Sequence, residues 1–586
     1  MTSWFKSLEG VLRSGAQQTE AGRKPLNMLQ ACTSQKTWNP SDLRDFKNFL
    51  AKLHLSWPEP PPKNVSALGV LLDLIYNWKL CFWFQIRVLK NFKRNGTHRI
   101  VLTPGATVEL YLFAFNHHNL VANGSYSQHW TDHERLFVDN GSVAQNIALA
   151  KKIANEEKKI IDTLLSVANK QVIIPTIIPL SDLGNYTNAV DSTEWIHQIN
   201  DTINIGDSFT LSDEVLVSDP SLLEAIGHLF DTFGDQEIIY HLSWQFVQTY
   251  AHIVDRNLLK SCEIHIAETI CQRHVQMAYN PLIVTMYVRL HPPEWRHTRL
   301  RANFELIMRQ ASKKVNGSSW LDAKSKEASM VKLKDMVVQT WPNKDLLRDM
   351  AQIYSTFPDG GREAGNSSFV HLWIKTRESL RALAATPFHD LICRFRPVPL
   401  PMLVAYDYFT NEVDVAVAAL GRPVYYENGT FAMFYGGIGF LFALEVMKMQ
   451  DALGVRLHPN GTVVSSWITR DSRLQFQDQK RCSGEASNSS SHQLLPTAVP
   501  ALEVTYAAFS SAVAHSNQSL QLSRELTEPK VFFMTLCLML CGTNSSKGEV
   551  VDCNLLLRNS HSFPDAFQCA PGTKMNPVKK CKYFDT

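Results

Sequence analysis

The chain has 586 residues, of which 45% are hydrophobic and 19% charged. This length and composition are ordinary for a globular protein with two or more domains, each able to bury a sizeable core. The net charge of only +3 gives no support for nucleic acid or an anionic membrane as a partner, and we expect neither.

The predicted elements of the first half are mainly helices. A polar cap followed by apolar residues at helical spacing predicts a helix over 39–55, which ends at the proline-rich SWPEPPPKN. Residues 143–170 form a long amphipathic pattern whose other face is rich in lysine and glutamate. Strand patterns are few: KQVIIPTIIPL at 170–180 and RIVLTPGATVELYLF at 99–113.

Helical patterns continue toward the middle of the chain at 221–233 and 238–254. The segment SSWLDAKSKEASMVKLKDMVVQTW, residues 318–341, opens with serine caps and goes on as an amphipathic run. Proline density rises at 384–401, where we place a boundary between two lobes. The chain is therefore predicted to be mainly α, with an α+β character and two regions, 1–385 and 386–586.

No segment is predicted to cross a membrane. Of the three most apolar windows, 69–86 contains charged residues, 431–447 ends close to a glutamate, and 531–541 is too short. All three are read as buried helices. The first 24 residues lack the unbroken apolar core of a signal peptide.

Other features indicate a secreted glycoprotein. The glycosylation sequon Asn-X-Ser/Thr occurs at thirteen positions, a clear excess over chance. They are Asn64, Asn95, Asn123, Asn140, Asn185, Asn200, Asn316, Asn366, Asn428, Asn460, Asn488, Asn517 and Asn544. The eleven cysteines contain no CxxC pair, which argues against a zinc ribbon or a thioredoxin-like motif. Five of them fall between Cys537 and Cys581, which suggests a C-terminal region tied by disulfides.

The C-terminal segment LLLRNSHSFPDAFQCAPGTKMNPVKKCKYF, residues 555–584, resembles the closing segment of the neprilysin and endothelin-converting-enzyme family of zinc metallopeptidases. The segments 318–336 and 404–415, and YGGIG at 435–439, resemble further motifs of that family. The resemblance covers the chain from about residue 25 to its end. It implies a two-lobed, mainly helical ectodomain whose C-terminal region, 386–586, carries a thermolysin-like zinc site.

The resemblance also implies a secreted or extracellular location, with an upstream signal or anchor that the printed chain does not contain. It implies the disulfides Cys32–Cys271 and Cys482–Cys581. Two further cysteines lack their family partners, so they are unpaired, pair with each other, or pair with Cys537 or Cys553; these are Cys541 and Cys569. No partner is assigned to Cys81, Cys262 or Cys393.

The zinc chemistry of the family needs His-Glu-X-X-His on a helix, because a spacing of four places both imidazoles on one face. The printed sequence has no such motif. Laid on the family pattern, the two histidine positions are Leu444 and Lys448, and only the glutamate is kept, as Glu445. Leucine has no lone pair to offer a metal, and a lysine ammonium has three donors and no acceptor.

Other family positions have also changed. The third zinc ligand falls on Leu494 and its supporting carboxylate on Ala498. The backbone segment that holds the substrate peptide in the family falls on Val404 and Ala405, without its asparagine. We therefore predict no cofactor, and an inert Glu445 that pairs with Lys448 at i, i+3, the ammonium occupying part of the former cation site.

Metal chemistry elsewhere is not expected. His129 and His133 have a spacing compatible with zinc, but sequons flank them, and we read HWTDHE as an exposed loop with solvated histidines. His117 and His118 are a weaker pair still.

Three interpretations follow. The first is a catalytically inactive, secreted scaffold that binds peptides between its lobes, or binds a protein partner. The second is an active zinc endopeptidase of oligopeptides with a different ligand set, the label that similarity alone would assign. The third is a chain that folds poorly, against which the retained helical periodicity and the spread of sequons argue.

Overall fold

The computed structural model describes most of the chain. The described residues are 2–35, 39–80, 82–90, 98–105, 107–138, 147–170, 172–206, 208–259, 264–290, 294–340, 344–359, 368–383, 386, 403–459, 461–475, 497–516, 523, 525–540 and 553–584.

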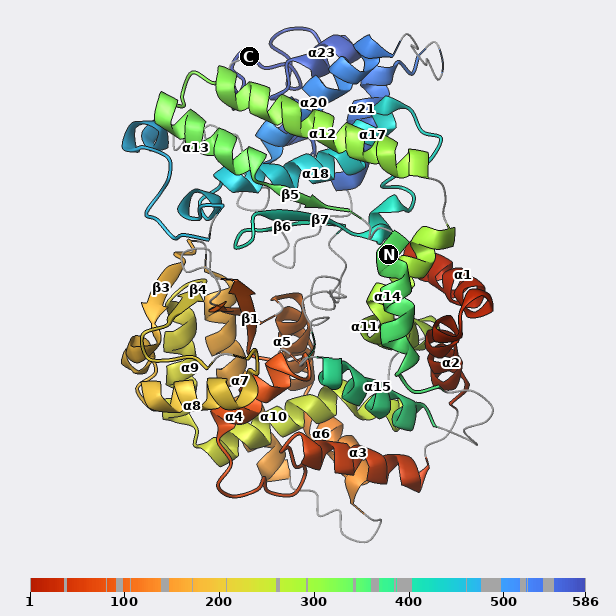
Figure 1. Ribbon diagram of the computed structural model, residues 1–586, viewed down its shortest axis with the longest axis vertical. Coiled ribbons are helices and arrows are strands. Elements are labelled where there is room, and N and C mark those ends of the chain that lie inside the picture. The colour runs from red at the N-terminus through yellow and green to blue at the C-terminus, as the bar shows by residue number, and fades with distance from the viewer. Residues whose placement is uncertain are drawn as a thin grey trace.

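The described residues form two lobes of mainly α-helical structure (Figure 1). The lower lobe in the figure contains α3 (Pro40–Lys52), α4 (Ala67–Tyr76), α5 (Thr107–Ala122), α6 (Tyr126–Phe137), α7 (Ile147–Ala168), α8 (Ser192–Thr202), α9 (Ser221–Thr232), α10 (Asp235–Tyr250) and α15 (Phe369–Leu383). Its strands are β1 (Phe84–Lys90), β2 (His98–Pro104), β3 (Thr176–Pro179) and β4 (Glu214–Val217).

The upper lobe contains α12 (Glu294–Gly317), α13 (Ala323–Lys334), α17 (Phe431–Gly436), α18 (Ile438–Met447), α20 (Ala498–His515), α21 (Glu528–Leu540), α22 (Cys553–Leu557) and α23 (Ser562–Phe567). Its strands are β5 (Val337–Gln339), β6 (Val404–Asp407) and β7 (Glu412–Val415). Along one side of the molecule run α1 (Thr2–Gln18), α2 (Glu20–Ser34), α11 (Ile264–Leu290) and α14 (Lys344–Ser355).

In the described part of the chain, each lobe has one small sheet. The lower sheet has the order β1-β2-β4-β3, with an antiparallel β1–β2 pair and a parallel β2–β4 pair. The upper sheet has the order β5-β7-β6, in which β6 pairs antiparallel with β7 and lies at the edge. Strand β5 precedes α14 and α15 in the chain, yet it pairs with β7.

The lobes are therefore not two contiguous halves of the chain. Residues 294–340 pack in the upper lobe, where α12 contacts α18 and α20, whereas α15 returns to the lower lobe and contacts α3. The predicted lobe boundary at 384–401 lies almost wholly outside the described residues. The division into regions 1–385 and 386–586 stays a prediction.

The lobes contact each other at the lower sheet. Val101 of β2 and Leu216 of β4 form an apolar cluster with Phe409 and Leu457 of the upper lobe. Beside it, Arg87 of β1 donates to Asp407 of β6 over 2.6 Å.

Local sequence explains several helix boundaries. Asn39 caps α3, because its side chain accepts a hydrogen bond from the Ser41 amide at 3.1 Å and Pro40 occupies the first turn. The predicted helices at 39–55, 143–170, 221–233 and 238–254 are confirmed as α3, α7, α9 and α10. The strand prediction at 170–180 is confirmed for β3.

Several predictions need correction. The expected strand over 99–113 ends at Pro104 and the chain turns into α5, because Pro104-Gly105 breaks the strand. The window 69–86 is helical only to Tyr76 and then enters β1. The run over 318–341 is capped by Asp322, whose carboxylate accepts from the Ser325 amide at 2.8 Å, rather than by serine, and its end is β5.

The segment HWTDHE is not an exposed loop. It lies within α6, because Trp130, Leu136 and Phe137 bury one face of that helix against the core.

Within the described residues, we find no helix long and apolar enough to cross a membrane. The windows at 431–447 and 531–541 are confirmed as buried helices, except that Met534 and Leu538 of α21 are exposed.

Candidate active site

The helix that resembles a zinc-binding helix, α18, is embedded in the upper lobe. It follows α17 through the glycines of YGGIG. A Cβ on Gly436 would lie 2.3 Å from the Phe532 carbonyl oxygen of α21, and one on Gly437 would lie 2.5 Å from the Val424 carbonyl oxygen. Both glycines thus permit a close backbone approach that no larger residue allows.

Glu445 points from α18 to both Lys448 and strand β6. The Lys448 ammonium lies 2.7 Å from each oxygen of the Glu445 carboxylate. The two side chains are 29% and 13% exposed, Lys448 being the more exposed, so the pair is partly shielded from water. This confirms the predicted i, i+3 ion pair.

The Glu445 carboxylate has a second partner that the sequence did not indicate. One oxygen accepts the backbone N–H of Tyr406 at 2.8 Å. Tyr406 lies in β6, so its N–H is donated to α18 rather than across the sheet to β7. The carboxylate therefore joins the helix to the edge strand and receives charge-assisted hydrogen bonds from both sides.

The positions that correspond to the family's substrate-holding segment also lie in β6. Val404 is buried and Ala405 is half-buried. They pair with Val415 and Asp414 of β7, respectively. Strand β6, with Val404 and Ala405, therefore packs against α18, with Glu445, and Lys448 follows at the end of that helix.

A buried polar network lies beyond the C-terminal end of α18. The Tyr408 hydroxyl donates to Asp451 at 2.5 Å, and Asp451 also accepts the Leu453 and Gly454 amides at 3.0 and 2.8 Å. Burial raises the pKa of Asp451 despite these hydrogen bonds.

Lys332 of α13 completes this network. Its buried ammonium donates to the Gly454 and Leu457 carbonyl oxygens at 2.5 and 2.6 Å. Burial lowers its pKa to about 7, although Asp451 acts in the opposite direction. Sequence reasoning missed Lys332 because its carbonyl partners lie more than a hundred residues away, and no periodic pattern marks such contacts.

One of the two remaining positions lies at the start of α20, which packs against α18. Ala498 is the first residue of α20 and is fully buried. Leu494 lies outside the described residues.

The described residues at these positions do not fit zinc. Leu444 is buried and has no donor atom, and Ala498 likewise has none. The Lys448 ammonium is a hydrogen-bond donor already directed at Glu445. Elsewhere in the described part of the chain, no three His, Cys, Asp or Glu side chains lie together as metal ligands.

The histidines of α6 are packing residues, contrary to the prediction of solvated side chains. His133 is buried and its Nδ1 lies 2.8 Å from the His129 carbonyl oxygen. The His129 and His133 rings lie 5.8 and 5.3 Å from the ring of Trp244. Burial lowers the pKa of His133. His117 is also buried, and its Nε2 lies 3.0 Å from the Ala154 carbonyl oxygen.

One of the two disulfides that the resemblance implies lies within the described residues. Cys32 and Cys271 are bonded, with Cα atoms 5.7 Å apart, as predicted. Cys537 bonds to Cys553, and Cys569 is free. Cys581 takes part in a disulfide, but Cys482 and Cys541 lie outside the described residues, so the Cys482–Cys581 pair stays a prediction.

Comparisons with known proteins find relatives of this chain in sequence and in structure. The sequence profile described as "Peptidase family M13" matches residues 5–341. Human neprilysin is 21% identical over 507 residues, which are 77% of this chain and 66% of neprilysin. Endothelin-converting enzyme 1 of Cavia porcellus is 27% identical over 257 residues, which are 39% of this chain and 33% of that enzyme.

These matches span between a third and two thirds of the relatives' own lengths. Among solved structures, the Mycobacterium tuberculosis zinc metalloprotease Zmp1 in complex with an inhibitor matches with a TM-score of 0.67 and 14% identity. That match covers 99% of this chain and 93% of the other. It confirms the predicted mainly α fold with a zincin-type lobe.

Proposed function

The chain belongs to peptidase family M13, as its resemblance to the neprilysin and endothelin-converting-enzyme family predicted, and we propose that it is a catalytically inactive member that binds peptides or proteins without cleaving them.

One observation carries this proposal: the state of Glu445. In a zinc endopeptidase the corresponding glutamate takes a proton from metal-bound water, so it must face that water. Here the same carboxylate accepts hydrogen bonds from the Lys448 ammonium and the Tyr406 amide. Both donors occupy its oxygens, and neither can activate a water molecule.

The replaced ligand positions support the same proposal. A leucine and a lysine stand at two of the zinc-ligand positions that the resemblance assigns, and a buried alanine stands at the position of the supporting carboxylate. Loss of one ligand alone would remove most of the activity, and these replacements all fall on the same zinc site. We propose that Lys448 supplies the positive charge that a metal supplies in the active relatives.

A secreted or extracellular location fits the described surface. Five of the six described sequon asparagines are exposed: Asn64, Asn123, Asn185, Asn316 and Asn428. The sixth, Asn200, is half-buried, and its side-chain amide donates to the Phe209 carbonyl at 2.9 Å and accepts the Phe209 amide at 2.7 Å. Two disulfides also favour an oxidising compartment. We propose glycosylation at the five exposed positions.

The test compares zinc content and cleavage with human neprilysin as the positive control. The full glycosylated chain is purified without chelator, its zinc is measured by mass spectrometry, and it is incubated with a broad library of peptides. We expect no stoichiometric zinc and no cleavage, together with saturable binding of some library peptides. Stoichiometric zinc with cleavage that a chelator blocks would overturn the proposal and establish the alternative, an active zinc endopeptidase with a different ligand set.

A further inference from the structure

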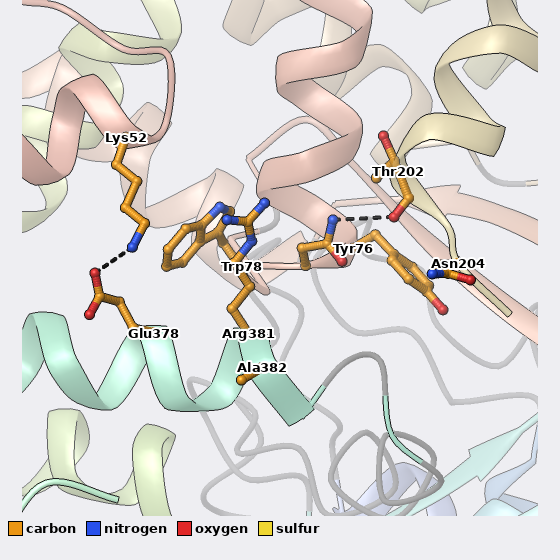
Figure 2. A pocket seen from close by; sticks show the side chains of 9 residues that line it. Lys52, Tyr76, Trp78, Thr202, Asn204, Glu378, Arg381 and Ala382 are labelled. Carbon is orange, nitrogen blue, oxygen red and sulfur yellow. Dashed lines mark hydrogen bonds and ion pairs between the residues drawn. The ribbon is translucent and has the colours of Figure 1, made fainter.

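The described part of the lower lobe has a pocket of about 400 Å³ on elements that contribute nothing to the candidate active site (Figure 2). The residues that line it come from the ends of α3, α4 and α8 and from α15. Those used below include Lys52, Trp78, Thr202, Asn204, Glu378 and Arg381. This volume lies within the range that small-molecule sites occupy in proteins.

Arg381 is held in a fixed orientation at this pocket. Its guanidinium lies 4.8 Å from the centroid of the Trp78 ring and donates to Asp73 over 3.3 Å. Asp73 in turn accepts the Trp78 indole N–H at 2.9 Å and the Asn77 side-chain amide at 2.7 Å. The ring and the carboxylate thus fix the guanidinium before any ligand arrives, which lowers the entropic cost of binding.

Most of the hydrogen-bonding capacity of Arg381 is not used by the described residues. A guanidinium has five N–H donors in a planar fork. The described residues accept one hydrogen bond from it, through Asp73, and the side chain is 40% exposed. The planar fork matches the two oxygens of a carboxylate or phosphate group.

A second cation, Lys52, stands beside the same ring. Its ammonium lies 6.0 Å from the Trp78 centroid and 2.6 Å from the Glu378 carboxylate. Glu378 has another partner, because Lys375 donates to its second oxygen at 2.9 Å. Lys52 can therefore turn toward a ligand without leaving Glu378 unpaired.

The charges around the pocket are unequal. Lys52, Lys375 and Arg381 are three cations, whereas Asp73 and Glu378 are two carboxylates, and both carboxylates are already paired. The opposite wall is formed by Tyr76, Thr202 and Asn204, none of which carries a charge. The balance of charge around the pocket is therefore positive.

We propose that this pocket binds the oxyanion group of a small organic ligand, with Arg381 and Lys52 as its two cationic partners. The ligand group is a carboxylate or a phosphate or sulfate ester, since all three present coplanar oxygen pairs to a guanidinium. The body of the ligand lies toward Thr202 and Asn204. This site is independent of the proposed function of the upper lobe.

The experiment uses ligand-observed NMR on the full glycosylated chain with three probes. Benzoate carries a carboxylate, phenyl phosphate carries a phosphate, and benzamide is a neutral control of the same shape. We expect at least one anion to bind with Kd near 1 mM, and benzamide not to bind. Tighter binding of benzoate would assign a carboxylate ligand, and tighter binding of phenyl phosphate a phosphate or sulfate ester.

Two variants locate the binding. Arg381→Gln should raise the Kd of the anion by about tenfold, which is a common effect of losing one charged contact. Arg13→Gln is the matched control, because it removes the same charge from an exposed i, i+4 pair on α1 and should change nothing. Lys52→Gln provides a second test at the site should Arg381→Gln fold poorly, with a weakening of about threefold expected. Equal affinity in the two site variants and the control, or no anion binding at about 10 mM, would overturn the proposal.

Discussion

Glu445 offers the sharpest test of how the candidate active site has changed. We consider Glu445→Ala, which removes the carboxylate that accepts both the Tyr406 amide and the Lys448 ammonium. A hydrogen bond to a charged acceptor contributes about 1.5–3 kcal/mol, and its loss leaves the Tyr406 N–H without an acceptor. The ion pair contributes about 0.5–1 kcal/mol, because Lys448 is 29% exposed and solvent screens the charge. The local stability should fall by about 2–4 kcal/mol in total.

Glu445→Gln separates the two contributions. A glutamine keeps a carbonyl oxygen for the Tyr406 amide and loses only the charge that attracts Lys448. We expect it to cost about 1–2 kcal/mol, because the Tyr406 hydrogen bond becomes a neutral one and the attraction of Lys448 is lost, so part of the effect of alanine should disappear. Glu9→Ala is the control, because it breaks an exposed i, i+4 pair with Arg13 and should cost less than about 0.5 kcal/mol.

The assay is hydrogen exchange of the peptides that cover β6, with thermal unfolding measured in parallel. Exchange is preferred because a chain of two lobes need not unfold in one step. Glu445→Ala should speed exchange across β6 and lower Tm, and Glu445→Gln should do so to a smaller extent. If Glu445→Ala left the protein unchanged or stabilised it, the structural role of Glu445 argued here would be wrong. Glu445 would then behave as a strained functional carboxylate, because catalytic groups often cost stability.

Three further predictions concern other parts of the fold. Burial raises the pKa of Glu157 from 4.5 to about 7. Between these two pH values the folded state keeps a proton on Glu157 that the unfolded state releases. The contribution of Glu157 to the free energy of unfolding therefore falls by up to about 3 kcal/mol as pH rises from 4.5 to 7. The Tm of Glu157→Gln should therefore rise relative to the Tm of the parent protein as pH increases from 5 to 8. A Tm difference that stays constant over this pH range would contradict this. Gly436→Ala should lower Tm by the equivalent of about 1–3 kcal/mol, because its Cβ would meet an α21 carbonyl. Gly10→Ala has no atom within 4 Å of its Cβ and should be neutral or stabilising, so equal effects would refute the packing argument. The Arg87–Asp407 pair joins the lobes over 2.6 Å and should show a coupling energy of about 1 kcal/mol in a double-mutant cycle with Arg87→Met and Asp407→Asn. Additive effects of the two substitutions would show that the pair contributes nothing between the lobes.

Local patterns in the sequence were sufficient for much of the fold. The helices α3, α7, α9 and α10 follow from spacing and caps, because a helix repeats its contacts every three or four residues. The Glu445–Lys448 pair followed for the same reason, since i, i+3 neighbours lie on one face of a helix. Family membership and the Cys32–Cys271 disulfide came from motif resemblance, which periodicity alone does not supply.

Where sequence reasoning failed, the deciding contacts joined distant segments. HWTDHE looked like a loop between sequons, but the ring of Trp244 packs against His129 and His133 and makes α6 part of the core. Strand β5 pairs with β7, although the described helices α14 and α15 lie between these strands in the sequence.

The sequence by itself determined which residues stand at the former zinc positions and that Glu445 has a lysine one turn away. Only the tertiary structure decided what Glu445 does, because its second partner, the Tyr406 amide, lies on a strand 39 residues earlier. The same holds for the pocket at Trp78, whose two cations come from α3 and α15. A backbone donor and a cation from another helix leave no periodic signal in the sequence, since their positions depend on how the elements pack.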